Sequence, residues 1–572
     1  MTSPDDRHQP ERTTPASAGN GAREPAAPTG SITATAPRER FVLDSAHVGD
    51  IQGAFGTIRQ HDEGHRDLRS RLLALLAIIG PGLIVMVGDN DAGGVATYSQ
   101  AGQNYGTSLL WVLLLLIPVL IVNQEMVVRL GAVTGVGHAR LINERFGRFW
   151  GWFSVGDLFL LNFLTIVTEF IGVSLALGYF GISQYIAVPL AAIALVAITV
   201  TGSFRAWERS MFVFVFANFL VIPLFFMSHP TAGPIVHDFF IPGIEGGANS
   251  ASVLLIIAMV GTTVAPWQLF FQQSNIIDKR ITPKWINYER VDTWLGAFVV
   301  VLGAAALICV SAFAFAHTPY FGNFTDAGAT ATALDKTLGS VAGAFFALVL
   351  LNASLIGAAA LTLSTSYAFG DVFGMKSSLH RSFADAKLFY GIFSLLIAGA
   401  AVIVLIPGAP LGVITEAVQA LAGVLLPSAS VFLLLLCNDP EVLGPWVNRP
   451  WLNALASVIV AILVLLSLIL MATTLFPSVD VTTVALVGGA VLAVGLIVFG
   501  ALTLRPSHAG AAPTPTVGGQ AVPKEQWTMP PLALLQRPRW STGRKIAMLT
   551  LRGYLVVAVL LLVIKAVQLG GG

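Results

Sequence analysis

Charged side chains are scarce in this sequence. Asp, Glu, Lys and Arg make up 11% of the residues, while 55% are apolar; a soluble domain has about 25% charged residues. The deficit extends along almost the whole chain, and mean hydropathy is +0.76. These values exclude an ordinary soluble protein and predict a membrane protein. The formal net charge of +1 gives no reason to expect a nucleic-acid partner.

Cysteine is nearly absent as well. The only two, Cys309 and Cys437, lie in or at the end of apolar runs, which excludes a disulfide scaffold and a zinc module. No set of nucleophile, base and orienting group is recognisable, so we expect no enzymatic activity and no resident cofactor. The N-terminus is polar and rich in Pro, Ala, Thr and Arg, and it shows no cleavable signal peptide.

Long apolar runs recur from residue 72 onward, and each is long enough to cross a bilayer. The sequence predicts twelve spans, at roughly 72–103, 107–130, 151–181, 183–202, 207–228, 251–277, 292–316, 340–370, 386–406, 411–436, 452–475 and 482–503, with a possible thirteenth at 546–568. The resulting organisation is a cytoplasmic, largely disordered region (1–71), a ten-helix core (72–436), two further helices (437–503), a Pro-rich cytoplasmic linker (504–545) and a possible last helix (546–572).

The basic residues predict the orientation, because cytoplasmic loops carry the excess of Lys and Arg. They gather before the first predicted span and in every second loop after it, where examples are Arg66, Arg140, Arg280, Arg381 and Arg449. The alternate loops hold almost none, apart from Lys336. We therefore expect a multi-pass protein of the cell membrane, a bacterial inner or plasma membrane, with its N-terminus in the cytoplasm.

Two spans are interrupted at corresponding places. In the first, the run from Gly80 to Gly88 leads into Asp89-Asn90-Asp91-Ala92-Gly93-Gly94. In the sixth, the run ends at Thr262-Thr263-Val264-Ala265-Pro266-Trp267-Gln268. Proline removes a backbone donor, and unpaired backbone at membrane depth occurs only where it lines a cavity or is buried in protein. Matched interruptions in two halves of a chain point to a transporter's binding site.

The chemistry of these breaks favours a cation. Each first half-helix ends in free carbonyls at the negative end of its dipole, and Asp91 adds a full negative charge. Oxygen ligands with a carboxylate suit a hard divalent ion. The alternative role of Asp91 is to cap the second half-helix, and Asp89 and Asn90 are equally suited to pore lining and to structural hydrogen bonds. Glu169 is a second carboxylate within a span. We expect it to function in coupling transport to another ion or in the ion pathway.

At these motifs the chain resembles the natural resistance-associated macrophage protein (NRAMP) family of divalent-metal transporters. The segment from Gly80-Pro81-Gly82 to Asp91-Ala92-Gly93-Gly94 is similar to the family's GPG…G-x-x-DPGN, and Ala265-Pro266-Trp267-Gln268 stands where the family has MPHN. Thr168-Glu169-Phe170-Ile171-Gly172 resembles its third helix, and Gln419, eight residues before Pro427, its tenth. The resemblance covers about residues 72–455. It implies an all-α, LeuT-like fold with a five-plus-five inverted repeat, broken helices 1 and 6, and one or two additional C-terminal helices.

By this resemblance the site comprises Asp91, the carbonyls of Gly88 and Thr262, and Gln419 nearby. The family's asparagine ligand is Gly94 here, and its methionine ligand is Ala265. These departures resemble the NRAMP-related magnesium transporter branch, which lacks the soft methionine. The side chains of Asp89, Asn90, Thr262, Thr263 and Gln268 are candidates to hydrogen-bond waters of a hydrated ion, which is an inference from their position in the breaks.

The positions at which the family has proton-relaying side chains also differ in this sequence. The two helix-six histidines of the family are Trp267 and Gln272, and an aspartate that precedes the helix-three glutamate is Ile166. Trp267 and Glu169 are therefore the expected pathway residues. The first hypothesis is uptake of hydrated Mg²⁺, and Mn²⁺, by alternating access without proton coupling. The alternatives are a proton-coupled Mn²⁺/Fe²⁺ symporter and a sodium-coupled symporter of an organic solute; a buried Asp91 beside the half-helix N-termini disfavours the last.

Overall fold

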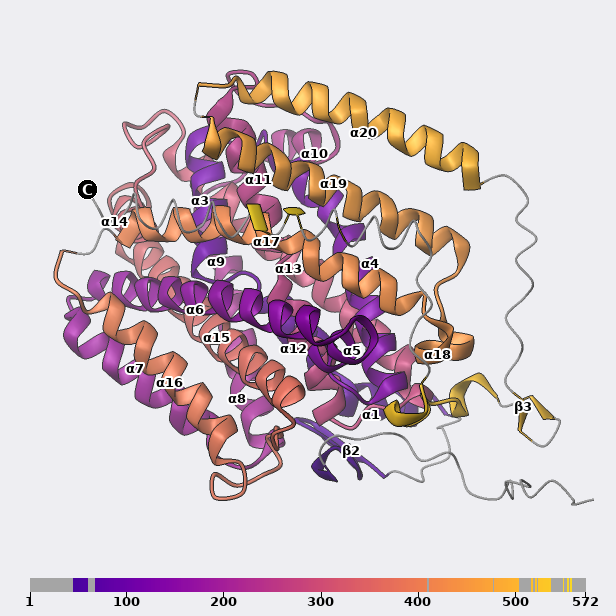
Figure 1. The fold of residues 1–572 in the computed structure, drawn as a ribbon. Helices are drawn as coiled ribbons and strands as arrows, with labels where there is room; N and C mark the ends of the chain where they lie inside the picture. Colours follow the sequence, from indigo (N-terminus) through magenta and orange to yellow (C-terminus); the bar gives the residue numbers. More distant parts are fainter. Residues whose placement is uncertain are drawn as a thin grey trace, which may run out of the picture. The chain divides into compact units, whose positions relative to one another are not determined.

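The computed structural model describes residues 45–59, 67–408, 411–476, 478–503, 516–517, 520–521, 523–535, 549, 553–554 and 556–557. All of them belong to the compact unit Arg38–Gly572. Helices make up most of this unit (Figure 1). The predicted run at 546–568 lies almost entirely outside the described residues.

Each of the twelve predicted spans coincides with one helix or with a broken group of helices (Figure 1). These are α1 (Leu68–Ile78), α2 (Pro81–Val87), α3 (Ala92–Tyr105), α4 (Leu110–Thr134), α6 (Arg148–Tyr179), α7 (Gln184–Thr199), α8 (Phe204–Ala217), α9 (Val221–Met227), α11 (Ser250–Thr263), α12 (Pro266–Asp278), α13 (Ile286–Phe315), α15 (Ser340–Phe373), α16 (Lys387–Val404), α17 (Leu411–Cys437), α19 (Pro450–Leu475) and α20 (Val481–Thr503).

The loops contain shorter elements that the sequence did not predict. They are the helices α5 (His138–Phe146), α10 (Ala232–Phe240), α14 (Ala327–Leu338) and α18 (Pro440–Leu443), the hairpins β1 (Ile51–Gly53) with β2 (Gly56–Ile58) and β3 (Thr516–Val517) with β4 (Gln520–Ala521), and the 3₁₀ turns η1 (Ser45–His47), η2 (Asn218–Leu220), η3 (Pro283–Trp285), η4 (Gly444–Trp446), η5 (Lys524–Gln526) and η6 (Leu532–Leu534). In β1–β2, Ile51 pairs with Ile58 in antiparallel register.

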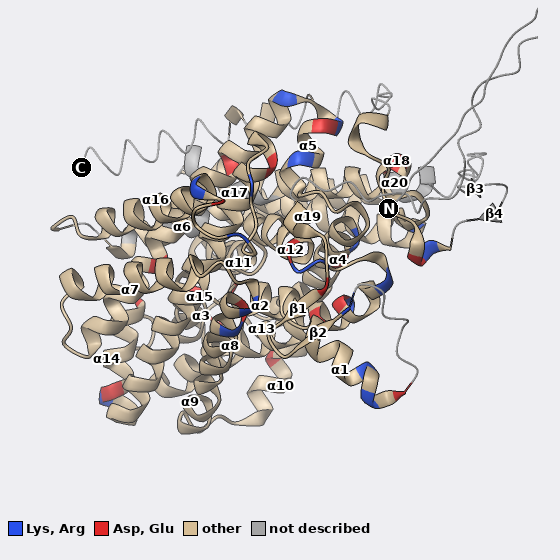
Figure 2. Cartoon of the chain, turned by 90° about the horizontal axis from the view of Figure 1, so that it is seen from below, with Lys and Arg blue, Asp and Glu red and all other residues tan. Residues whose placement is uncertain are grey.

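Eight helices in the described part of the chain are long and apolar enough to cross a membrane, or nine if the bent pair α1–α2 counts as one span. Shorter apolar helical segments are α7 and, where their side chains are described, Pro427–Cys437 of α17 and Val481–Ile497 of α20. The protein is therefore a multi-pass membrane protein. Charged residues are few along its long helices, and several gather near α1 and α5 (Figure 2).

The core forms where long helices pack closely around the two predicted breaks. α15 packs along α6, and α13 packs against α2, α3 and α4. Small residues permit this approach: a Cβ atom on Gly82 would lie 2.8 Å from the Thr293 nitrogen, and one on Gly296 would lie 2.9 Å from the Gly82 carbonyl oxygen. Glycines at such crossings let backbones come together in the absence of a hydrophobic driving force between helices.

The segment 45–58, within the region 1–71 that was predicted to be largely disordered, contains an ordered hairpin. Ile51, Ala54 and Ile58 are buried, and the hairpin packs against α1 and α8. Its backbone is held by charged side chains: the Ala54 amide donates to Glu208 Oε2 at 2.5 Å, and Arg209 Nε donates to the Ala54 carbonyl at 2.9 Å. The buried side chains of this hairpin therefore attach part of the predicted cytoplasmic lead-in to α1 and α8.

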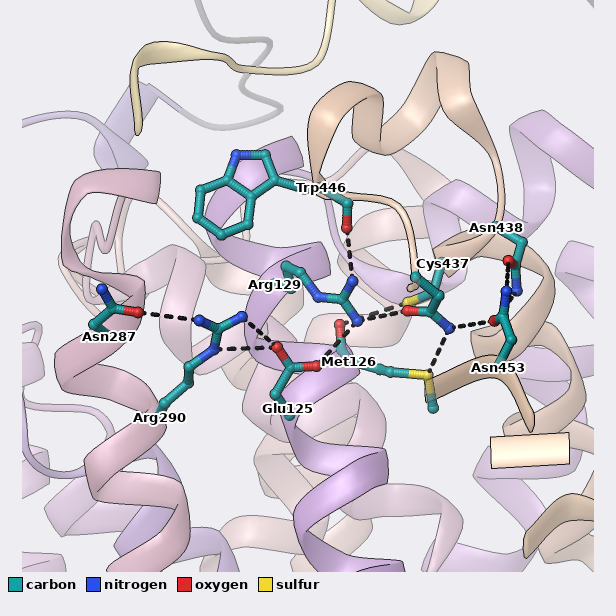
Figure 3. A network of polar contacts seen from close by, with 10 residues as sticks. Glu125, Met126, Arg129, Asn287, Arg290, Cys437, Asn438, Trp446 and Asn453 are labelled. Carbon is teal, nitrogen blue, oxygen red and sulfur yellow. Dashed lines mark hydrogen bonds and ion pairs between the residues drawn. The ribbon is translucent and has the colours of Figure 1, made fainter. Parts of the chain in front are cut away.

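A polar network joins α4 to α13 and to the segment between α17 and α19 (Figure 3). Glu125 on α4 accepts hydrogen bonds from Arg290 on α13 and from Arg129 one turn further along α4. Arg129 also donates to the Trp446 carbonyl and to Asn448 Oδ1, both at 2.6 Å. Because this network connects α4 to α13 and to the segment between α17 and α19, it fixes the end of α4 relative to its neighbours.

Candidate metal site

The first span breaks between α2 and α3, as the sequence predicts. Gly88 ends α2, and Asp91 is the N-terminal cap of α3, where its Oδ1 accepts a 2.7 Å hydrogen bond from the Gly94 amide. The amides of Asp89 and Asn90 bond back to carbonyls of α2. Asp91 thus fills the capping role considered as its alternative, and this bond engages one of its two carboxylate oxygens.

The sixth span breaks between α11 and α12. Val264 and Ala265 are extended, and Pro266 begins α12 at a position where a missing amide costs least. Gln268 spans the break: its Nε2 donates to the Thr263 carbonyl and its Oε1 accepts from the Ala265 amide, both at 3.3 Å. Thr262 lies in the last turn of α11, whose carbonyls have no donor within the helix.

Two contacts bring the breaks together. Tyr98 on α3 shares a 2.7 Å hydrogen bond with the Thr263 hydroxyl on α11. A Cβ atom on Gly88 would lie 3.5 Å from the Trp267 ring, so the indole of α12 packs against the end of α2. The negative ends of two half-helices and the Asp91 carboxylate therefore meet in one buried region, where Asp91 is 4% exposed.

Glu169 joins this region from α6. Its Oε2 accepts a 3.1 Å hydrogen bond from the Ala92 amide, the first amide of α3. Gly357 on α15 makes room for both acids, because a Cβ there would lie 2.9 Å from the Glu169 carboxyl and 3.0 Å from Asp91 Cβ. The carboxylates of Asp91, at the start of α3, and Glu169, on α6, are thus neighbours, and both pack against α15.

Several buried oxygens at the breaks have no protein partner among the described residues: Asp89 Oδ2, Thr262 Oγ1 and Glu169 Oε1. Buried polar atoms are normally hydrogen-bonded to protein, water or a ligand. An oxygen-rich, acidic region of this kind suits a hard cation or its hydration shell. Within the described part of the chain, no three His, Cys, Asp or Glu side chains are placed to hold a metal ion together, so any protein ligands would include carbonyl, hydroxyl or amide oxygens.

The remaining predicted residues divide into two groups. Ala265, Gly94 and Gln268 lie at the breaks, and Gln268 and Thr263 already have protein partners. Asn90 instead turns to α13, where its Nδ2 donates to the Val300 carbonyl at 3.1 Å. Gln419 belongs to α17, which packs against α11, but its side chain lies outside the described ones.

Sequence reasoning missed Tyr98, Gly357 and Gln124 as part of this region. Gln124 on α4 donates to Gln268 Oε1 at 3.3 Å and so supports the residue that spans the second break. Polar residues within apolar spans are a usable signal for Tyr98 and Gln124. Gly357 lies in a run of small residues (Gly357–Ala360) that only marks a close helix contact.

Comparisons with known proteins agree with this geometry. The family described as "Natural resistance-associated macrophage protein-like" (Nramp) matches residues 82–473. A divalent metal cation transporter MntH of Mesorhizobium japonicum is 29% identical over 307 residues, which cover 51% of this chain and 66% of that protein. The MntH of Bacillus subtilis is 27% identical over 346 residues, covering 58% and 75% respectively.

The solved structure of an Eremococcus coleocola manganese transporter, bound to an aromatic bis-isothiourea substituted compound, superposes with a TM-score of 0.60. It is 19% identical, and the match covers 78% of this chain and 98% of that one. A mutant of the same transporter gives 0.62, with 81% and 99% covered. These likenesses establish the LeuT-like fold shared by such transporters, and together with the match over residues 82–473 they show that the chain belongs to the Nramp family.

Proposed function

We propose that this protein takes up divalent metal ions, Mg²⁺ and Mn²⁺, as hydrated ions by alternating access and without proton coupling. It would work in a bacterial plasma membrane with its N-terminus in the cytoplasm. Its relatives named as divalent metal cation transporters support the substrate class. The oligomeric state does not enter the proposal.

The observation that carries the proposal is the set of atoms at the paired breaks. Asp91 supplies charge, and the partnerless oxygens of Asp89 and Thr262 lie in the same two breaks. Ala265 stands at the position of the family's methionine ligand, and Gly94 stands at the position of its asparagine ligand. Thioether sulfur favours later transition metals over Mg²⁺, and Mg²⁺ gives up its waters reluctantly. A site with small residues and partnerless buried oxygens therefore favours an ion that keeps part of its hydration shell.

A buried histidine that contacts α12 supports transport without protons. His138 on α5 shares a 2.9 Å contact from Nδ1 to Gln273 Oε1 on α12. Burial lowers the pKa of His138 to about 4, although the bond to Gln273 opposes this change. The imidazole is therefore neutral throughout the physiological range and does not take up a proton there.

Flux into proteoliposomes tests the proposal. Uptake of Mg²⁺, Mn²⁺ and Ca²⁺ would be measured together with internal pH. We expect Mg²⁺ and Mn²⁺ uptake with no acidification beyond that of protein-free liposomes. A parent protein that carries Mn²⁺ but not Mg²⁺, or internal acidification that rises with metal concentration, would refute the corresponding part of the proposal.

The second candidate is a proton-coupled Mn²⁺/Fe²⁺ symporter, and the position of Glu169 favours it. A carboxylate beside Asp91, with one oxygen lacking a protein partner, is suited to exchanging a proton when the metal binds. This candidate predicts acidification that disappears in Glu169→Gln while Mn²⁺ uptake persists.

A further inference from the structure

Residues 45–50, which precede the hairpin β1–β2 and are called the latch below, bind the end of α12. Arg280, just after that helix, donates from Nε to the Ala46 carbonyl at 2.9 Å and from Nη1 to the Asp50 carbonyl at 3.1 Å. Gly49 makes room for the guanidinium group, because a Cβ atom there would lie 3.0 Å from Nη1. The metal-transport proposal uses none of these contacts.

The latch also binds the loop between α15 and α16. His47 Nε2 lies 3.0 Å from the Ser377 carbonyl of that loop and 3.5 Å from Asp278 Oδ1, at the end of α12. Arg381, in the same loop, donates to Ser45 Oγ at 3.0 Å. The latch therefore joins the end of α12 to the end of α15.

α12 and α15 meet along a seam that runs from the second break to the latch. Near the break, Ser364 Oγ on α15 donates to the Trp267 carbonyl on α12 at 3.0 Å. Beside the latch, the Tyr367 hydroxyl on α15 donates to Asp278 Oδ2 at 2.5 Å. These two bonds hold the helices together on both sides of the seam.

The seam is closed below the latch. The cavity between α12 and α15 there has a volume of about 10 Å³, and Ser274, Tyr367 and His47 are among its lining residues. A cavity needs at least about 10–15 Å³ to hold one water molecule, whereas a hydrated Mg²⁺ ion keeps several. The seam must therefore open before a hydrated ion passes it, and His47 stands at its outer end.

The backbone of Arg280 is strained. Its φ is +68°, a left-handed conformation that favours glycine and that glycine usually supplies after a helix. Such strain persists only where surrounding contacts hold it. The two bonds to the latch are what the arginine side chain provides here and glycine would not.

The hairpin and the latch are attached to the helices in different ways. Ile51, Ala54 and Ile58 of the hairpin are buried against α1 and α8. All six residues of the latch are exposed or half-buried, and its printed contacts are polar. Segments with few buried apolar contacts open most easily, so the latch can release while the hairpin stays in place.

We infer that the latch is a strap that keeps the seam between α12 and α15 closed, and that it leaves Arg280 and the α15–α16 loop before an ion passes. The inference rests on the proposed function, because alternating access requires the helices beyond a central site to separate at each end in turn. In the proposed orientation this end is cytoplasmic, so the latch controls release of the ion into the cell. It does not depend on which divalent ion is carried.

The test is labelling of Ser274→Cys by a hydrophilic maleimide, in the full-length protein in detergent. Ser274 lines the closed cavity and is 6% exposed. The two native cysteines are buried, so the parent protein gives the background. The latch is released by Arg280→Gly, which removes both bonds and relieves the strained backbone. The matched control is Lys376→Gln, an exposed cation of the α15–α16 loop that has no bond to the latch among the described residues.

Ser274→Cys should be labelled slowly, and about tenfold faster when Arg280→Gly is added, because the hydrogen bonds of one charged group shift an opening equilibrium by about that factor. His47→Ala should also raise the rate, and Lys376→Gln should leave it unchanged. The unfolding midpoint of Arg280→Gly should not lie below the parent's. Equal labelling with and without Arg280→Gly, or faster labelling with a lowered midpoint, would overturn the inference. Labelling needs no metal gradient, so its result is distinguishable from a failure of the transport proposal in liposomes.

Discussion

Asp91 combines a structural and an electrostatic role that two substitutions separate. Asparagine caps helices as well as aspartate does, but it carries no charge. Asp91→Asn should therefore keep the bond from the Gly94 amide and lose metal transport. Asp91→Ala should lose transport and, in addition, about 1 kcal/mol of stability with the cap. Metal uptake by proteoliposomes and thermal melting of the same preparations measure the two effects.

Both variants should insert and purify as single species, because the rest of the break is held by other bonds. Parental Mn²⁺ uptake by Asp91→Asn would remove the charge of Asp91 from the ion site. A matched substitution outside the breaks is Asp335→Asn, on the loop helix α14, which should change neither transport nor the unfolding midpoint.

The selectivity of the site should move toward softer ions when the family's ligands are restored. Ala265→Met adds a thioether and Gly94→Asn adds an amide oxygen, both where waters of a hydrated ion would lie. Relative to Cd²⁺, binding of Mg²⁺ should weaken by about 1–3 kcal/mol, a typical size for a specificity difference. Mn²⁺ should lose less than Mg²⁺. Calorimetry or competition with the three ions gives the order.

Gly94 belongs to α3, so its backbone conformation does not require glycine. A Cβ there would lie 3.1 Å from the Asp89 carbonyl oxygen, which asks for a shift of a few tenths of an ångström. Ala265→Met should for that reason be made alone as well as with Gly94→Asn. An unchanged ranking of ions in Ala265→Met, or a parent that prefers Cd²⁺ to Mg²⁺, would contradict the hydrated-ion account.

At the scale of elements, the bend of 50° between α1 and α2 is held by buried charges. Asp292 on α13 accepts from the amides of Gly80, Gly82 and Leu83, at 2.7–3.2 Å, so it satisfies the free donors that begin α2. Lys279, after α12, donates to the Ile78 and Ile79 carbonyls at 2.6 and 2.9 Å. Asp292 of α13 thus holds the start of α2, and Lys279, which follows α12, holds the end of α1.

Lys279 also pairs with Glu208 on α8 at 2.6 Å, and both side chains are fully buried. Removing one partner of such a pair leaves an unpaired buried charge and costs about 3–5 kcal/mol. We expect Lys279→Met to lower the unfolding midpoint strongly, and Lys279→Met with Glu208→Gln to recover part of the loss. A midpoint equal to the parent's in Lys279→Met would show that the pair does not stabilise the bend.

The breaks could be predicted from sequence because their causes are local. The Asp-Asn-Asp-Ala-Gly-Gly run and Pro266 do not suit a continuous helix, and α2, α3, α11 and α12 end or begin there. The partners of the breaks are distant in sequence and could not be predicted: Asp292 binds residues more than 200 positions away, and Glu169 meets Ala92 across 77. Such pairings depend on how whole helices pack, which local periodicity does not encode.

At the scale of the whole molecule, residues far apart in sequence pack onto the ends of the transport helices. The hairpin β1–β2 packs against α1 and α8. Within the predicted linker 504–545, the segment 523–535 packs against the end of α4 and η4: the Met529 amide donates to the Val133 carbonyl at 3.2 Å, and Trp446 Nε1 donates to the Lys524 carbonyl at 2.8 Å. Part of the segment that composition assigned to a linker is therefore hydrogen-bonded to the helical core.

Trp527 is the anchor of the segment 523–535, and its removal tests whether that segment stabilises the transport helices. The side chain is 4% exposed and packs against Gly444, two residues before Trp446, which belongs to the network of Figure 3. Truncating a buried tryptophan costs about 3–5 kcal/mol where the surroundings cannot collapse, so Trp527→Ala should lower the unfolding midpoint while metal uptake at low temperature stays within twofold of the parent's. Trp451→Ala is the matched control, since that tryptophan is 61% exposed and its loss should change neither quantity. If both variants melt with the parent, the segment is docked without stabilising the helices, and the network of Arg129 and Glu125 holds the end of α4 unaided.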